Sequence, residues 1–139
     1  MAQLLHNIRH ALVQEFLQVA EKVAPLSFAD CSWDNVGLLF ESPHVKLVGP
    51  AKACRVLLTV DLTEAVFAEA VAKEASIILS YHPPWFRGEK SLTLDRSRGM
   101  MRMVALCAAH GISIYSPHSA LDAIPGGSKR WSSAFLTVP

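Results

Sequence analysis

The sequence lacks most features that would assign it directly to a functional class. Only 18% of its 139 residues are charged and the formal net charge is +1, which gives no general attraction to nucleic-acid phosphates. No apolar run approaches the roughly 20 residues that span a bilayer, so neither nucleic acid nor a membrane is an expected partner. Phosphate-loop, GxGxxG, GxSxG and HExxH motifs are also absent.

Cysteines are few and dispersed. Cys31, Cys54 and Cys107 form no CxxC pair, a pattern more typical of a reducing compartment than of a disulfide framework. The N-terminus has no apolar core followed by a small-residue cleavage site, so secretion is not expected. Glu15 and Glu21 argue against a mitochondrial presequence. We predict a cytoplasmic location, and the nucleus and the mitochondrion stay open as alternatives.

Apolar residues make up 51% of the chain and recur with clear periods, which favours a single domain over residues 1–139. Between Leu5 and Val23 they recur every three or four positions, and Pro25 ends the pattern, so a first amphipathic helix is predicted. Residues 28–40 are predicted to be irregular. Beyond them, the predicted strands are residues 55–60, 76–79 and 112–114, and the predicted helices are residues 61–74 and 95–110.

This alternation predicts an α/β fold in which parallel strands are joined by crossover helices. Gly111 is well placed to cap the third helix at its C-terminus. Asp61, with Glu64 three residues later, resembles a capping box and is interpreted first as the N-cap of the second helix. The alternatives for Asp61 are a metal ligand or a residue that orients one.

Two histidines follow predicted strands closely: His82 after residues 76–79 and His118 after residues 112–114. If these strands are parallel neighbours, both imidazoles emerge at the carboxyl edge of the sheet, where ligands bind in such folds. Asp122 follows His118 by four residues, the spacing of one helical face. Two imidazoles and a carboxylate predict a site for zinc, iron or manganese. The alternative is that His118 and Asp122 form only a local hydrogen-bonded pair.

Three neighbouring residues have two interpretations each. Tyr81 is a poor metal ligand while it is protonated, so it would orient a neighbour or donate a proton, or else simply be a half-buried aromatic residue. Asp34 and Asn35 would position a substrate or orient a metal ligand. Their alternative role is turn formation before an apolar run, and the sequence leaves both open.

Three segments in order, Trp33–Leu39, Leu79–Phe86 and Tyr115–Asp122, resemble motifs of a known family. The chain is similar to the N-terminal half of the NIF-three-like (Ngg-one-interacting factor three-like) proteins, also called GTP cyclohydrolase I type 2 homologues. The form of residues 81–84 looks like the eukaryotic branch. The resemblance implies an α/β fold, a dinuclear metal site and a homo-oligomer.

The family's metal ligands carry over to His82, His118 and Asp122, whereas Tyr81 stands where many bacterial members have histidine. The family draws a further histidine and glutamate from a C-terminal segment, so the resemblance implies a truncated domain that holds one metal ion rather than two. We expect a metal-dependent hydrolase of unknown substrate, in which water bound to the metal attacks. The name GTP cyclohydrolase comes from the family alone, and nothing in these residues establishes GTP as the substrate. The alternative is a non-catalytic module that binds a protein partner in transcriptional regulation.

Overall fold

The computed structural model describes residues 2–44, 54–88, 91–95 and 99–127, and for residues 2–10 it describes the backbone alone. Among these residues, four short strands form one mixed sheet in the order β1-β4-β3-β2. Three of them are parallel, as predicted: β2 (Val56–Thr59), β3 (Ile77–Ser80) and β4 (Ser113–Ser116). The fourth, β1 (Gly37–Phe40), pairs with β4 in the antiparallel direction.

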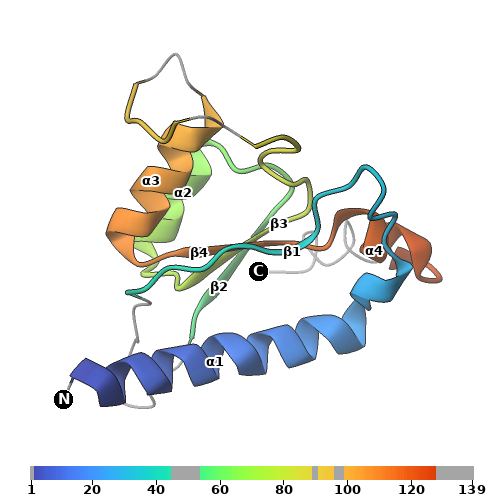
Figure 1. Ribbon diagram of the computed structural model, residues 1–139, viewed down its shortest axis with the longest axis horizontal. Coiled ribbons are helices and arrows are strands. Elements are labelled where there is room, and N and C mark those ends of the chain that lie inside the picture. The colour runs from blue at the N-terminus through green and yellow to red at the C-terminus, as the bar shows by residue number, and fades with distance from the viewer. Residues whose placement is uncertain (1, 45–53, 89–90, 96–98, 128–139) are drawn as a thin grey trace.

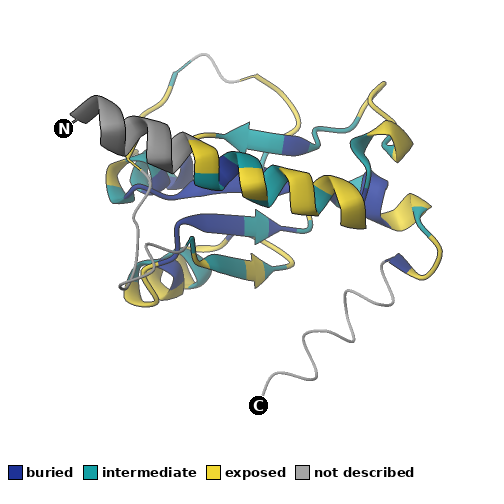
Figure 2. Ribbon diagram, turned by 90° about the horizontal axis from the view of Figure 1, so that it is seen from below, coloured by how far each residue is buried: buried dark blue, intermediate teal, exposed yellow. Residues whose placement is uncertain are grey.

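Helices cover both faces of this sheet (Figure 1). The crossover helices α2 (Glu64–Ala72) and α3 (Met100–His110) lie side by side on one face. The long helix α1 (Ala2–Val23) runs across the other face (Figure 2). A short 3-10 helix, η1 (Leu26–Phe28), packs against α4 (His118–Ala123) beyond the end of the sheet. The predicted α/β class, with parallel strands and crossover helices, is therefore confirmed.

Strand β1 corrects the prediction that residues 28–40 are wholly irregular. It begins at Gly37, whose φ of 93° is one that residues with a side chain rarely adopt. A Cβ atom there would also lie 3.0 Å from Cδ1 of Leu26. A segment of four residues is too short for an alternation of apolar and polar residues to predict a strand. It is a strand because it pairs with β4, beginning with Gly37 opposite Ser116.

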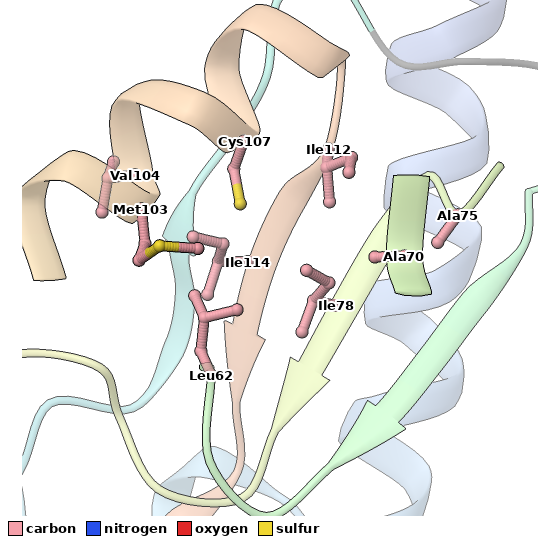
Figure 3. Packing of buried hydrophobic residues seen from close by; sticks show 9 residues of the cluster. All are labelled: Leu62, Ala70, Ala75, Ile78, Met103, Val104, Cys107, Ile112 and Ile114. Carbon is pink, nitrogen blue, oxygen red and sulfur yellow. The ribbon is translucent and has the colours of Figure 1, made fainter. Parts of the chain in front are cut away.

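The main hydrophobic core lies between the sheet and the helices α2 and α3 (Figure 3). Ile78 and Ile114 are partners across β3 and β4 and are fully buried at its centre. Cys107 from α3 is also fully buried there. Burial of a side chain the size of isoleucine contributes about 1.5–3 kcal/mol relative to exposure. This packing holds β3 and β4 together and so fixes the distance between the two loops that follow them.

Helix α1 agrees with the predicted bounds but not with the full predicted apolar stripe. Val13 is buried, and the ring of Phe16 packs edge-on against Tyr115 of β4 at 5.3 Å between centroids. Val19 and Val23, at the end of the stripe, are each 58% exposed. Among the described helices, none combines the length and apolar character needed to cross a membrane.

The ends of the crossover helices give one confirmation and one correction. Gly111 caps α3 in the left-handed conformation with a φ of 73°, as predicted. The predicted capping role of Asp61 is wrong, because α2 begins at Glu64 and its N-cap is Thr63, whose side chain accepts a hydrogen bond from the amide of Val66 at 3.2 Å. Asp61 is thereby left outside the helix and available to a different partner.

Candidate functional site

His82 lies just beyond the carboxyl end of β3 and pairs with Asp61, which lies just beyond the end of the neighbouring strand β2. Nδ1 of His82 is 2.8 Å from Oδ1 of Asp61. The parallel register of β2 and β3 brings these two strand ends together. Both side chains are accessible to water, with 64% of the Asp61 side chain exposed. Asp61, which the sequence favoured as a helix cap, therefore pairs with an imidazole instead.

His118 follows β4 and is held by a carboxylate that is completely buried. Nδ1 of His118 lies 2.8 Å from Oδ1 of Asp34, whose side chain is 0% exposed. The second oxygen of Asp34 accepts hydrogen bonds from both the backbone amide, at 3.1 Å, and the hydroxyl of Ser119. Asp34 therefore anchors the start of α4 as well as the imidazole. Asp34 thus contacts the imidazole directly, and it also has local bonds of the turn type, because its amide donates to the carbonyl of Asp30.

The charge state of Asp34 follows from these contacts. Burial alone would raise the pKa of this carboxyl, but hydrogen bonds from Ser119, His118 and Asn35 outweigh it and hold the pKa below the usual value. An ionised carboxylate can only accept hydrogen bonds, so Nδ1 of His118 carries the hydrogen and donates it. The lone pair of the neutral ring is then on Nε2.

The backbone at His118 has an uncommon conformation for a residue with a Cβ atom. Its φ is 22°, a positive value, although it is the first residue of α4. Such conformations persist where surrounding contacts determine them, and they are concentrated at functional sites. Here the contacts are those of Asp34 with the imidazole and with the amide of Ser119.

The two imidazoles lie beside each other, as the prediction of neighbouring parallel strands required. The ring centroids of His82 and His118 are 5.6 Å apart. The ring of Tyr81 contacts both imidazoles, with its centroid 4.8 Å from that of His82 and 5.5 Å from that of His118. Each histidine uses Nδ1 for its carboxylate, and within the described residues neither Nε2 atom has a hydrogen-bond partner.

Asp122 is drawn to the same place by Tyr81. The hydroxyl of Tyr81 donates to the Asp122 carboxylate, at 2.7 and 2.8 Å from its two oxygens. Burial, the hydrogen bond to Asp122 and the nearby negative charges raise the pKa of Tyr81 to about 12, so the phenol stays protonated at neutral pH. His118 and Asp122 therefore have separate partners, and in the described part of the chain no hydrogen bond joins them.

Asn35 ties two loops of the site together. Its side-chain amide donates to the carbonyl of Trp85 at 2.9 Å, and its backbone amide donates to Oδ1 of Asp34 at 2.8 Å. It thus links the loop before β1 to the loop after β3. Ser119 is a member of this network that sequence reasoning missed, and its position next to His118 was the only signal for it.

These contacts define what the arrangement can do chemically. Among the described His, Cys, Asp and Glu side chains, no group of three or more is already placed to hold a metal ion. Within the described part of the chain, the structure does bring together two imidazoles whose Nε2 atoms have no hydrogen-bond partner and, through Tyr81, the carboxylate of Asp122. This is a set of nitrogen and oxygen donors of the kind that zinc, iron and manganese accept.

Comparison with protein families gives a match over nearly the whole chain. The family model described as Duf34/NIF3 (NGG1p interacting factor 3) matches residues 11–138. The chain belongs to this family. The resemblance drawn from the three sequence motifs is therefore confirmed.

Individual NIF3 relatives agree with this assignment. The NIF3-like protein 1 of Drosophila melanogaster is 44% identical over 118 residues, which are 85% of this chain and 38% of that protein. The human NIF3-like protein 1 is 47% identical over 109 residues, which are 78% of this chain and 26% of that protein. The chain thus spans well under half the length of these relatives.

Solved structures show the same fold. A hypothetical protein of Staphylococcus aureus superposes with a TM-score of 0.69 at 30% identity, covering 83% of this chain and 35% of the other. A Bacillus cereus protein related to NIF3 also has a TM-score of 0.69, at 25% identity, covering 91% of this chain and 32% of the other. The NIF3 fold of this chain is supported by both sequence and structure.

Proposed function

We propose that this NIF3-family chain binds one divalent metal ion through His82, His118 and Asp122 and acts as a metal-dependent hydrolase. The observation that carries the proposal is the hydrogen-bond pattern that the two histidines share. Each imidazole uses Nδ1 for a carboxylate from a distant segment, and among the described residues its Nε2 has no hydrogen-bond partner; the two ring centroids lie 5.6 Å apart. Histidines that bind metals in proteins typically have this carboxylate partner.

The residues present fit such an ion by the chemistry of their donors. Two neutral imidazoles and a carboxylate form a three-ligand set of the kind found at catalytic zinc sites, which keep a further position open. Asp34 is ionised and buried, so it fixes the tautomer that offers Nε2 of His118. Asp61 has the same relation to His82 from an exposed position.

The other residues of the site control protons and orientation. A divalent cation would supply Lewis acidity towards an oxygen-containing substrate and towards water. Tyr81 holds its proton at the phenol oxygen and donates it in a hydrogen bond to Asp122, which limits the orientations that the carboxylate can take. Asn35 keeps the loop that contains Asp34 against the loop that follows His82.

Metal content measured by elemental mass spectrometry tests the proposal. The protein is purified without chelator and gel-filtered, and we expect about one equivalent of zinc, iron or manganese per chain, the content of a single three-ligand site. His82→Ala and His118→Ala should each lose the metal while retaining the wild-type circular dichroism spectrum. His44→Ala is the matched control, because His44 is exposed in a loop and should not affect metal content.

Hydrolysis is tested on the loaded protein with a panel of phosphate and carboxylic esters. Activity that disappears in His118→Ala and survives in His44→Ala would support the hydrolase. Full retention of metal by a folded His82→Ala or His118→Ala variant would contradict the site. A folded wild-type protein that binds no metal would contradict it as well, and the expected alternative, a non-catalytic module for a protein partner, would then be the function to test.

A further inference from the structure

An exposed pair of aromatic side chains stands next to the histidines and has no role in the proposed metal site. Trp33 comes from the loop before β1 and Phe86 from the loop after β3. Their ring centroids are 6.4 Å apart and their planes are inclined by only 29°. Trp33 is 55% exposed and Phe86 is 52% exposed. Large apolar side chains gathered in water at one place frequently mark a binding surface.

The pair directly contacts His118. The imidazole of His118 lies 5.9 Å from the ring of Trp33 and 6.0 Å from the ring of Phe86, in both cases edge-to-face. The same imidazole contacts Tyr81 at 5.5 Å. A molecule that binds to Trp33 and Phe86 would therefore lie next to His118, one of the candidate metal ligands.

Hydrogen bonds hold the backbone near both rings, although each of the two residues is about half exposed. On one side of Trp33, its own amide donates to the carbonyl of Asp30. On the other side, the side chain of the next residue, Asp34, is fixed by hydrogen bonds with His118 and Ser119. Asn35 then bonds the carbonyl of Trp85, the residue before Phe86. Anchoring of this kind reduces the ordering cost of binding, because the two rings are already held near each other.

We propose that Trp33 and Phe86 bind a planar aromatic or heteroaromatic ring of the substrate, and this assignment rests on the proposed function of the adjacent site. Two nearly parallel π faces favour a flat, polarisable partner over a saturated one. A ring inserted between them needs roughly 7–8 Å, twice the ~3.5–4.0 Å optimum for carbon contacts. Small rotations of two exposed side chains reach that separation from the observed 6.4 Å.

Two probes of equal charge distinguish stacking from general apolar affinity. Naphthoate is flat and aromatic, whereas decahydronaphthoate has the same carboxylate and carbon skeleton without the π system. Binding is followed by ligand-observed NMR and by the indole N–H signal of Trp33, which is assigned from its disappearance in Trp33→Phe. We expect the wild-type protein to prefer naphthoate by roughly 2- to 12-fold, the range measured for aromatic pairs.

Leucine variants test which residues cause the preference. Trp33→Leu and Phe86→Leu keep apolar bulk at exposed positions and should each remove most of the preference for naphthoate. Phe28→Leu is the matched control, because Phe28 is 57% exposed and no ring contact joins it to His118 among the described residues. Equal affinity of the wild-type protein for both probes would overturn the proposal, and so would an unchanged preference in both variants.

The titrations are made on metal-free and on zinc-supplemented protein, so that failure of the ring site and failure of the metal site can be told apart. A preference for naphthoate that depends on Trp33 and Phe86 in the metal-free protein supports the ring site even if zinc does not bind. Zinc binding without any preference for the flat probe overturns the ring site and leaves the metal site intact.

Discussion

Asp34 and His118 are 84 positions apart in the sequence, yet Oδ1 of Asp34 lies 2.8 Å from Nδ1 of His118. The loop that precedes β1 thus holds the imidazole of a histidine that follows β4. Because the Asp34 side chain is fully buried, water cannot replace it when it is changed. The corresponding carboxylate of His82, Asp61, is largely exposed and more easily replaced.

The two carboxylates should therefore differ in their effect on metal affinity. We predict that Asp34→Asn weakens zinc binding roughly 10- to 100-fold, the usual cost of losing the residue that orients a metal-binding histidine. Asp61→Asn should weaken it less, because solvent can solvate the free Nδ1 of His82. Affinity is measured by competition with a chelating dye. Asp30→Asn is the control, since the Asp30 side chain bonds Ser32 rather than a histidine, and equal losses for Asp34→Asn and Asp30→Asn would contradict the prediction.

The tyrosines should ionise only at very alkaline pH. The chain has two, and each has a pKa raised from 10 to about 12: Tyr81 by burial and by Asp122, and Tyr115 by burial and by the charge of Glu21. The unfolded chain loses these protons first as the pH rises above 10. The free energy of unfolding should therefore fall between pH 10 and about 12.

Ultraviolet difference absorbance of tyrosinate measures this directly in the native protein. Tyr81→Phe should remove one of the two late-titrating groups and part of the loss of stability at high pH. A native protein in which both tyrosines titrate near pH 10 would show that neither environment is as described.

The three cysteines should differ strongly in reactivity towards a thiol reagent. Cys31 is exposed, whereas burial raises the pKa of Cys54 and raises that of Cys107 to about 12. Because the thiolate is the reactive form, we predict rapid modification of Cys31, slower modification of Cys54 and none of Cys107 before unfolding. Cys31→Ser should abolish the fast phase alone. Rapid modification of all three thiols in the native protein would contradict the described core.

The core between the sheet and the crossover helices should dominate stability. We predict that Ile114→Ala lowers the free energy of unfolding by about 2–5 kcal/mol and that Ile114→Val lowers it by about 0.5–1.5 kcal/mol, because both leave a cavity in a tightly packed centre. Leu58→Ala, on the exposed side of β2, should change it by no more than about 0.5 kcal/mol. Urea unfolding measures all three, and similar losses for Leu58→Ala and Ile114→Ala would contradict this account.

Features that depend on local pattern were predictable from the sequence. The periodic apolar residues of α1, the proline after it and the glycine at the end of α3 gave the correct elements. The parallel order of the predicted strands placed His82 and His118 at one edge, because parallel strands that alternate with helices share the direction of their carboxyl ends. The family followed from three ordered motifs.

Features that depend on distant partners were missed. The signature of Asp61 and Glu64 is local, but the helix begins later and Asp61 instead pairs with His82, which lies 21 residues away. Residues 37–40 form strand β1 because they pair with β4. The contact of Trp33 with Phe86 joins two loops that are far apart in the sequence, and nothing in either loop predicts that they meet.

The sequence by itself determined which residues could serve the site, since helix and strand periods and residue chemistry are local properties. Only the tertiary structure decided which carboxylate holds which histidine, and that Tyr81 binds Asp122. The physical reason is that side-chain hydrogen bonds act over about 3 Å. Which groups come that close depends on how β2, β3 and β4 are packed together, and no segment of the chain encodes that packing alone.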